Sequence, residues 1–291
     1  MKSANPVFIG FILASVIFLN AVNKQQVEQN PNVLSSSSTS LFGKFLATKP
    51  QTSDTQNIQT ELEAAVKNTP GTFSVYILNP YNLEQFSINP DKKYYAASLY
   101  KLLVAQAVAF QIKSKEMTLD TRITYTREDF TDGSGTIAAT YKFGDKISVD
   151  ILLDKLLKDS DNIAQNMLVR SLPEISLIEA NLLVGKNSTF YSKNIASTVE
   201  VSNLLKSLDT QMLARMYKTS FDDRISLGLD SDVNFSHKIG NWGQTGSWHD
   251  CGIALNNEKQ IIVCVMSENT TFENFTAVSK SVGKVVSKLL N

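Results

Sequence analysis

The chain has 291 residues, 43% of them hydrophobic and 19% charged, a balance typical of a globular protein. Its 28 basic residues equal its 28 acidic residues, so no net charge favours nucleic acid or an anionic membrane as a partner. Two histidines, His237 and His249, and two cysteines, Cys251 and Cys264, do not have the number or spacing of zinc ligands. We therefore expect no metal, no cofactor and no nucleic-acid partner.

The N-terminus indicates export. Lys2 precedes an apolar stretch, residues 7–19, which as a helix would span about 20 Å of a hydrocarbon core roughly 30 Å thick. Residues 1–22 are therefore interpreted as a signal peptide. An uncleaved membrane anchor is the alternative, because Leu19 is unfavourable for cleavage after Ala21. In both cases the rest of the chain lies outside the cytoplasm, either secreted or held at the membrane by its N-terminus.

Residues 23–56 are polar and include a serine-rich run at 35–40, which predicts a flexible linker. The pattern of a folded domain begins at residue 57 and continues to residue 291, where apolar residues recur at helix and strand spacings. We therefore expect one globular domain after the linker.

The predicted elements follow from hydrophobic periodicity and turn residues. A first helix begins near residue 57 and ends at Pro70-Gly71, and strands follow at 73–78 and 83–88. Helices are then predicted at 98–112, 149–157, 162–170 and 199–208, strands at 236–240, 248–255 and 260–267, and a last helix at 273–290. This order predicts an α/β fold, in which an antiparallel sheet from both chain ends is flanked by the terminal helices and an all-helical subdomain is inserted between its strands.

A serine and a lysine lie three positions apart at the start of the second predicted helix. A serine hydroxyl is a weak nucleophile that needs a nearby base, and positions i and i+3 share one helix face, so Lys101 can lie beside Ser98. The helix N-terminus adds free N–H groups that favour a developing oxyanion. Taken alone the spacing is a weak signal, because Ser281 and Lys284 repeat it in the last helix, where we interpret them as surface residues.

Two other short segments suit the same chemistry, although each also has a structural explanation. Residues 160–162, Ser-Asp-Asn, are typical of a helix N-cap, but they also supply a hydroxyl for proton transfer and an amide to hold a substrate. Residues 238–240, Lys-Ile-Gly, fit an exposed strand, but they also supply a positive charge and a glycine beside which a substrate backbone could lie.

Together the three segments resemble the class A β-lactamases and related penicillin-binding proteins, whose motifs are S-x-x-K, S-D-N and K-T-G. The resemblance covers residues 57–291. It includes Asp-Gly-Ser-Gly at 132–135, before the second motif, and His-Asp-Cys-Gly at 249–252, after the third. It implies a β-lactamase and transpeptidase-like fold, with the active site between the sheet and the helical subdomain.

The resemblance assigns catalytic roles to three side chains. Ser98 would attack the substrate carbonyl, Lys101 would be the base for acylation, and Ser160 would pass the proton to the leaving nitrogen. Lys101 must then be partly neutral, which its burial or the nearby charge of Lys238 would achieve.

The resemblance also implies the residues that bind substrate. Asn162 would hold the substrate amide, and Lys238 would attract its carboxylate. The backbone N–H groups of Ser98 and Asn241 would form the oxyanion hole, with Gly240 beside the bound substrate.

The implied function is that of a monomeric serine hydrolase that opens β-lactam rings through an acyl-enzyme. One alternative is a D-Ala-D-Ala carboxypeptidase or another penicillin-binding hydrolase of cell-wall peptides. Another is a penicillin sensor without enzymatic activity, which is disfavoured because about six residues precede the apolar stretch, too few for a cytoplasmic output domain.

The segment between the second and third motifs departs from the family. Class A enzymes deacylate with a glutamate in this segment, but here Ser160 and Lys238 are 78 positions apart, which leaves little room for that loop. Glu174, Glu179 and Glu200 are the acidic candidates, and Glu200 is better interpreted as a first-turn residue of a helix. We therefore expect fast acylation and slow deacylation.

The third motif also departs from the family, because Ile239 stands where threonine is usual. The hydroxyl that would bind a substrate carboxylate is then missing, and Thr245 or Ser247 are candidates to replace it.

The two cysteines lie in the last predicted hairpin. If Asn257 and Glu258 are its turn centre, the register pairs Cys251 with Cys264, at a spacing that permits a disulfide in an exported protein. A pair of reduced core cysteines is the alternative.

Overall fold

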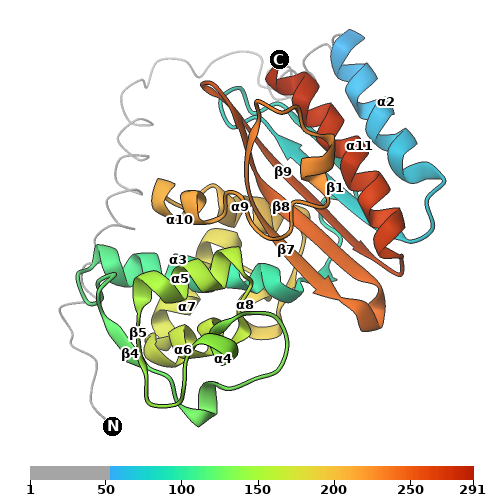
Figure 1. Ribbon diagram of the computed structural model, residues 1–291. Helices are drawn as coiled ribbons and strands as arrows, with labels where there is room; N and C mark the ends of the chain where they lie inside the picture. The colour runs from blue at the N-terminus through green and yellow to red at the C-terminus, as the bar shows by residue number, and fades with distance from the viewer. Residues whose placement is uncertain (1–52) are drawn as a thin grey trace, which may run out of the picture. The chain divides into compact units, whose positions relative to one another are not determined.

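The computed structural model describes residues 53–291, with side chains from residue 57 onward (Figure 1). The predicted signal peptide or anchor and most of the predicted linker lie outside the described residues. The first described helix, α2 (Ser53–Lys67), begins four residues before the predicted start of the domain. Within residues 53–291, no helix is long and apolar enough to cross a membrane.

A five-stranded antiparallel sheet is built from both ends of the domain, as predicted. Its order is β2-β1-β9-β8-β7, so β7 is an edge strand. The strands are β1 (Thr72–Leu78), β2 (Gln85–Ile88), β7 (Asn234–Trp242), β8 (Ser247–Asn256) and β9 (Lys259–Glu268). Strand β7 extends beyond the predicted 236–240 at both ends.

Each face of the sheet has its own apolar core, because successive strand residues point to opposite faces. In β1, Phe73, Val75 and Ile77 belong to one core with residues of α2 and of α11 (Phe272–Leu290). Tyr76 and Leu78 belong to the other core, together with the helical region. Figure 1 shows α2 and α11 on one side of the sheet and the other labelled α-helices on the opposite side.

The helical region is centred on α3 (Tyr100–Lys113), in which residues 101–108 are all buried. Such a helix, apolar nearly all round, has to be enclosed by other elements. It is surrounded by α4 (Ile137–Thr140), α5 (Val149–Lys158), α6 (Asn162–Ser171), α7 (Glu174–Val184), α8 (Phe190–Lys193), α9 (Thr198–Leu205) and α10 (Thr210–Arg215). The predicted α/β fold with an inserted helical subdomain is confirmed.

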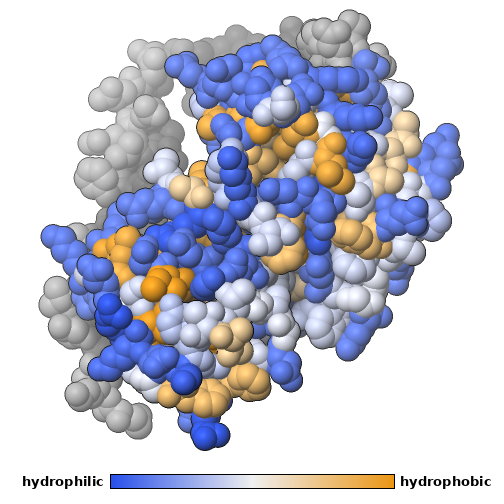
Figure 2. Space-filling view, viewed as in Figure 1, coloured by the Kyte–Doolittle hydropathy of each residue, from blue (hydrophilic) through white to orange (hydrophobic). Residues whose placement is uncertain are grey.

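Several elements of the helical region differ from the prediction. Helix α7 was not predicted, because its apolar residues lie on its exposed side (Ile175, Ile178, Leu182) as well as on its buried side, so no polar face marks it as an amphipathic helix. The small sheets β3–β6 (Tyr94–Tyr95 with Ile195–Ala196) and β4–β5 (Arg122–Thr124 with Lys146–Ser148) were also missed, because their strands are only two or three residues long. Figure 2, viewed from the same side, shows a mostly hydrophilic face with small apolar patches.

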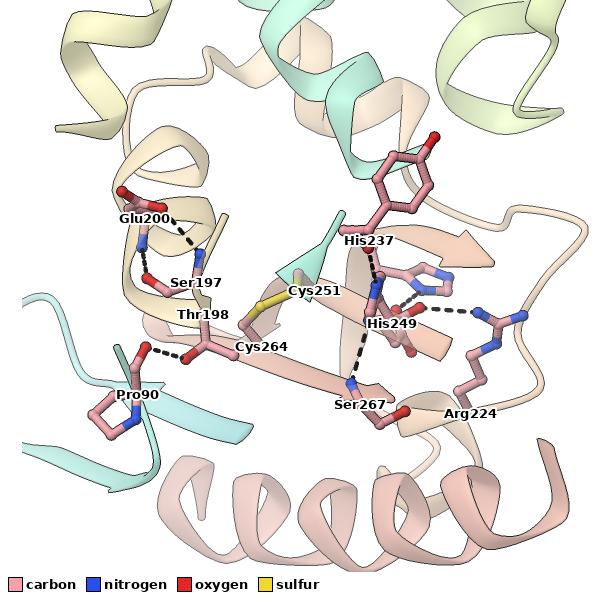
Figure 3. The surroundings of a disulfide bond; sticks show 12 residues. Pro90, Ser197, Thr198, Glu200, Arg224, His237, His249, Cys251, Cys264 and Ser267 are labelled. Carbon is pink, nitrogen blue, oxygen red and sulfur yellow. Dashed lines mark hydrogen bonds and ion pairs between the residues drawn. A yellow bond between two sulfur atoms is a disulfide. The ribbon is translucent and has the colours of Figure 1, made fainter. Parts of the chain in front are cut away.

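The last hairpin has the predicted register, which places Cys251 opposite Cys264. The two residues form a disulfide, with their Cα atoms 3.9 Å apart, so the reduced alternative is not what the structure contains (Figure 3). The bond is fully buried in the core shared with the helical region.

Candidate active site

A cavity of about 490 Å³ lies between the helical region and the edge strand β7. All three predicted catalytic residues line it: Ser98, Lys101 and Ser160. The other lining residues are Tyr95, Ala97, Thr131, Gly133, Ser134, Asn162, Gln165, Asn166, Asn194, Phe221, Ile239, Asn241 and Trp242.

Ser98 lies in a short 3₁₀ turn, η1 (Ala97–Leu99), immediately before α3. The preceding residue, Ala97, has φ of 50°, in the left-handed region that residues with a side chain rarely adopt. Asn194 holds this segment: its side-chain amide donates to Ala97 O (3.1 Å), and its carbonyl accepts from Ala96 N (2.9 Å). Backbone strain of this kind persists where the surroundings impose it, which is common at functional sites.

Lys101 lies at the centre of the polar cluster. Its Nζ is 2.9 Å from Ser98 Oγ, 3.3 Å from Ser160 Oγ and 2.7 Å from Asn162 Oδ1. Burial lowers the pKa of Lys101 to about 8, against the opposing effect of the Asp161 carboxylate. A substantial fraction of this amine is therefore neutral near physiological pH and able to accept a proton.

The Ser-Asp-Asn segment combines the two interpretations of its sequence. Asp161 caps α6 by accepting from Ala164 N (2.9 Å), and its other oxygen accepts from Thr136 N (2.6 Å) and Ile137 N (2.8 Å). Ser160 and Asn162, on either side of this cap, contact Lys101. Ser160 has φ of 55°, so it is a second strained residue in the site.

The loop at residues 132–135 packs against this segment, as the resemblance implies. Ser134 Oγ donates to Ser160 O (2.6 Å), and Asn162 N donates to Ser134 O (2.9 Å). Gly133 has φ of +121°, and a Cβ atom there would lie 2.5 Å from Asn162 Nδ2. A glycine is therefore needed where the loop approaches the asparagine.

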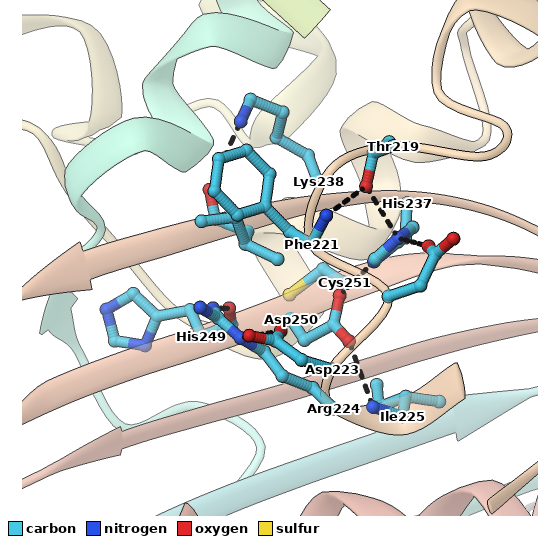
Figure 4. A network of polar contacts seen from close by, with 12 residues as sticks. Thr219, Phe221, Asp223, Arg224, Ile225, His237, Lys238, His249, Asp250 and Cys251 are labelled. Atoms are coloured by element: carbon cyan, nitrogen blue, oxygen red, sulfur yellow. Dashed lines mark hydrogen bonds and ion pairs between the residues drawn. The ribbon is translucent and has the colours of Figure 1, made fainter. Parts of the chain in front are cut away.

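Lys238 is placed differently from the expectation that it faces a substrate carboxylate. Its side chain is 1% exposed and does not line the cavity, and its Nζ lies 6.0 Å from the ring centroid of Phe221 (Figure 4). Burial and the positive charges of Lys101 and Arg224 hold its pKa well below the usual range. Phe221 is thus the residue that faces the cavity at this position.

The structure explains the glycine at position 240 differently from the sequence analysis. A Cβ atom there would lie 2.6 Å from Ala96 O, so the glycine lets the segment that carries Ser98 pack directly on β7, rather than leaving space for a substrate. The next residue, Asn241, does line the cavity. Its Oδ1 accepts from an Arg224 guanidinium nitrogen (2.9 Å).

Arg224 was missed by the sequence analysis. It is buried, and it also donates to His249 O (2.9 Å), so that it joins β8 to the end of β7 (Figures 3 and 4). It lies just before η3 (Ile225–Gly228), in a segment without hydrophobic periodicity, and an isolated arginine there gives no signal of this role.

His237, next to Lys238 on β7, belongs to a buried polar network. Its Nδ1 is 2.7 Å from Asp250 Oδ1, and its Nε2 is 2.9 Å from Asp222 Oδ1. Although burial opposes the charged form, these two carboxylates raise the pKa of His237 to about 9. The imidazole is therefore protonated at neutral pH and ties the 219–225 segment to the sheet (Figure 4).

The acidic candidates for deacylation lie elsewhere. Glu200 caps α9 with Ser197, which confirms its interpretation as a first-turn residue, and Glu174 accepts from Tyr191 Oη (2.9 Å). Glu179 lies on α7 and does not line the cavity. Within the described part of the chain, no aspartate or glutamate lines the cavity.

The proposed replacements for the threonine hydroxyl do not reach the cavity either. Thr245 and Ser247 contact each other in the β7–β8 turn, with their hydroxyl oxygens 2.6 Å apart, and neither lines it. Across residues 57–291, no group of three or more histidine, cysteine, aspartate or glutamate side chains could hold a metal ion.

Comparisons with known proteins agree with this geometry. The model of the β-lactamase enzyme family matches residues 57–291. No curated protein matches the chain. Among solved structures, an ancestral class A β-lactamase (GNCA) has a TM-score of 0.71 and 21% identity over 80% of this chain and 99% of its own. A β-lactamase from Sphaerobacter thermophilus has a TM-score of 0.69 and 20% identity over 81% and 97%.

A mutant of PBP-A, solved as an acyl-enzyme complex with penicillin G, has a TM-score of 0.70 and 18% identity over 80% of this chain and 96% of its own. At these identities the structural matches show the fold, and the family model covers residues 57–291, more than half of the chain. The chain therefore belongs to the β-lactamase enzyme family, a family of hydrolases that act on β-lactams, and has the fold of its class A members.

Proposed function

We propose that this enzyme opens β-lactam rings through a covalent acyl-enzyme on Ser98 and releases the product slowly. The observation that supports this most directly is the position of Lys101 Nζ, within 3.3 Å of the Ser98 and Ser160 hydroxyls and of the Asn162 amide oxygen. A buried amine with a pKa of about 8 beside a serine hydroxyl is the arrangement that nucleophilic catalysis requires.

Acylation follows from these contacts. Neutral Lys101 takes the proton of Ser98 Oγ, which attacks the lactam carbonyl carbon, and the negative charge that develops on the carbonyl oxygen is stabilised by the N–H groups of Ser98 and Asn241. The ring C–N bond then breaks. The nitrogen receives its proton from Ser160 Oγ, which is replenished from Lys101, so Lys101 ends the step neutral again.

Deacylation lacks a dedicated base. Water has to attack the ester carbon while a base takes its proton, and such assistance contributes about 10²–10⁴ in rate. The amides of Gln165, Asn166 and Asn194 line the cavity and can hold a water molecule, but an amide does not accept a proton at neutral pH. Lys101 is left as the base, and we expect the acyl-enzyme to accumulate.

We further propose that the enzyme acts outside the cytoplasm, because of its apolar N-terminal stretch. The Cys251–Cys264 disulfide supports this proposal, since such bonds persist mainly in oxidising compartments.

A second candidate is a D-Ala-D-Ala carboxypeptidase that β-lactams inhibit. The same observation favours it: without a carboxylate on the described cavity wall, a penicilloyl ester would persist. Release of D-alanine from a peptide ending in D-Ala-D-Ala, faster than β-lactam turnover, would identify this activity.

The experiment that tests the proposal is stopped-flow kinetics with a chromogenic cephalosporin. We expect a burst of about one equivalent per enzyme, followed by a slow steady state, and Ser98→Ala should abolish both phases. Ser281→Ala is the matched control, because Ser281 and Lys284 have the same spacing as Ser98 and Lys101 but lie on α11, where Ser281 Oγ donates to Ala277 O. Fast turnover without a burst would contradict slow deacylation, and a burst in Ser98→Ala would contradict the nucleophile.

A further inference from the structure

Two aromatic side chains line the cavity beside the nucleophile and remain accessible. Tyr95 is 41% exposed and Trp242 is 39% exposed, although large aromatic rings are usually more buried than this. Their ring centroids are 5.4 Å apart with an interplanar angle of 62°, an edge-to-face contact. They come from segments about 150 positions apart, so the fold brings together an exposed aromatic pair at the site.

The backbone of each residue is held by neighbouring strands, so the fold determines where each side chain starts. Tyr95 pairs with Ile195 in the β3–β6 sheet, and its carbonyl accepts from His249 Nε2 (2.9 Å). Burial lowers the pKa of His249 to about 4, so its ring is neutral. Its Nδ1 accepts from Ser267 N, which leaves the proton on Nε2 for Tyr95. Trp242 is the last residue of β7 and pairs with Ser247.

The order of residues along β7 shows which part of a substrate meets this pair. The positive charge of Lys101 is close enough to lower the pKa of Lys238. The part of β7 that contains Lys238 therefore lies near the residues that transfer protons to the leaving nitrogen. Asn241, three positions further, supplies the proposed oxyanion N–H. Trp242 follows it, roughly 13 Å from Lys238 at strand spacing. The acyl side of a bound substrate therefore lies next to Trp242.

We propose that Tyr95 and Trp242 form an aromatic subsite that binds a planar aryl group on the acyl side of the substrate. The enzyme then selects β-lactams with an aryl-acylated amine over those with a free amine. This inference rests on the proposed function and identifies its substrate class. The wall contributed by Thr131, Ser134 and Asn166 is polar, whereas Tyr95 and Trp242 form a contacting pair of exposed rings that also line the cavity.

The test compares the second-order acylation constants of benzylpenicillin and 6-aminopenicillanic acid, which share the ring system and differ in the aryl-acyl group. For Trp242→Ala we expect the acylation constant of benzylpenicillin to fall about 3- to 10-fold, which corresponds to the loss of one aromatic contact. The acylation constant of 6-aminopenicillanic acid should fall less than about 2-fold. Trp242→Phe should restore most of the selectivity. Tyr95→Ala should resemble Trp242→Ala, and Tyr81→Ala, which changes a tyrosine that is 70% exposed in the β1–β2 turn, should change nothing.

An equal loss with both compounds would show a structural role and overturn the proposal, and so would no loss with either. If neither compound acylates the wild-type enzyme, the proposed function fails. The subsite is then tested by the equilibrium binding of benzylpenicillin to Ser98→Ala and to Ser98→Ala combined with Tyr95→Ala. Weaker binding by the second variant supports the subsite, and equal binding contradicts it.

Discussion

The pKa of Lys101 makes a quantitative prediction about the pH dependence of acylation. Burial lowers this pKa from 10.5 to about 8, and the base has to be neutral to take the proton of Ser98. The neutral fraction is about 1% at pH 6 and about 50% at pH 8. The acylation constant should therefore rise about 50-fold between these values and level off above about pH 9, and the slope of its logarithm against pH should approach one only below about pH 7.

The measurement is the burst rate of a chromogenic cephalosporin under pseudo-first-order conditions, with the background hydrolysis subtracted by means of Ser98→Ala. Lys101→Arg is the control variant, because a guanidinium keeps the positive charge but stays protonated throughout this pH range. The acylation constant of Lys101→Arg should be at least 10²-fold lower than that of the wild type at every pH. A burst rate that is flat from pH 6 to 9, or one that Lys101→Arg retains, would refute the assignment of Lys101 as the base.

Three further predictions concern the surroundings of the site. The pKa of His237 is raised from 6.5 to about 9 in the folded protein, so its contribution to stability is full below about pH 6.5 and is lost as the pH rises through 9. The Tm of the wild type should therefore fall over this pH range, and the Tm of His237→Gln should not. Parallel plots of Tm against pH for the two proteins would exclude this linkage. Gly240→Ala places a Cβ atom 2.6 Å from Ala96 O. It should lower the free energy of unfolding measured in urea by about 1–3 kcal/mol and should also slow acylation. An unchanged free energy of unfolding would contradict the close packing. Reduction of Cys251–Cys264, which are 13 positions apart, should lower the unfolding free energy by about 2–4 kcal/mol, and an identical urea midpoint with and without reductant would argue against the bond.

The parts of the site that depend on local spacing could be predicted from the sequence. The i, i+3 relation placed Lys101 beside Ser98, and the capping pattern placed Glu200 on the first turn of α9. Counting residues back from the hairpin turn gave the Cys251–Cys264 register. Each of these relations involves residues that share one helix or one hairpin, where the geometry is regular.

The parts that depend on packing between distant segments could not be predicted. Lys238 is buried because Phe221, in an irregular segment, lies over it, and no periodicity indicates this contact. The same holds for Arg224, which joins β7 to β8 from a segment without a repeating pattern. The sequence identified Gly240 as a candidate site residue but could not show why a glycine is needed there. That need depends on the position of Ala96, about 140 residues earlier.

The central claim is that Ser98 carries the acyl group, and intact-protein mass spectrometry with peptide mapping tests it most directly. Wild-type enzyme is mixed with benzylpenicillin and quenched in acid at intervals from seconds to minutes. We predict a mass increase of one penicillin molecule within seconds, located on the peptide that contains Ser98, persisting for minutes and absent from Ser98→Ala. An adduct on another residue, or an undiminished adduct in Ser98→Ala, would contradict the account.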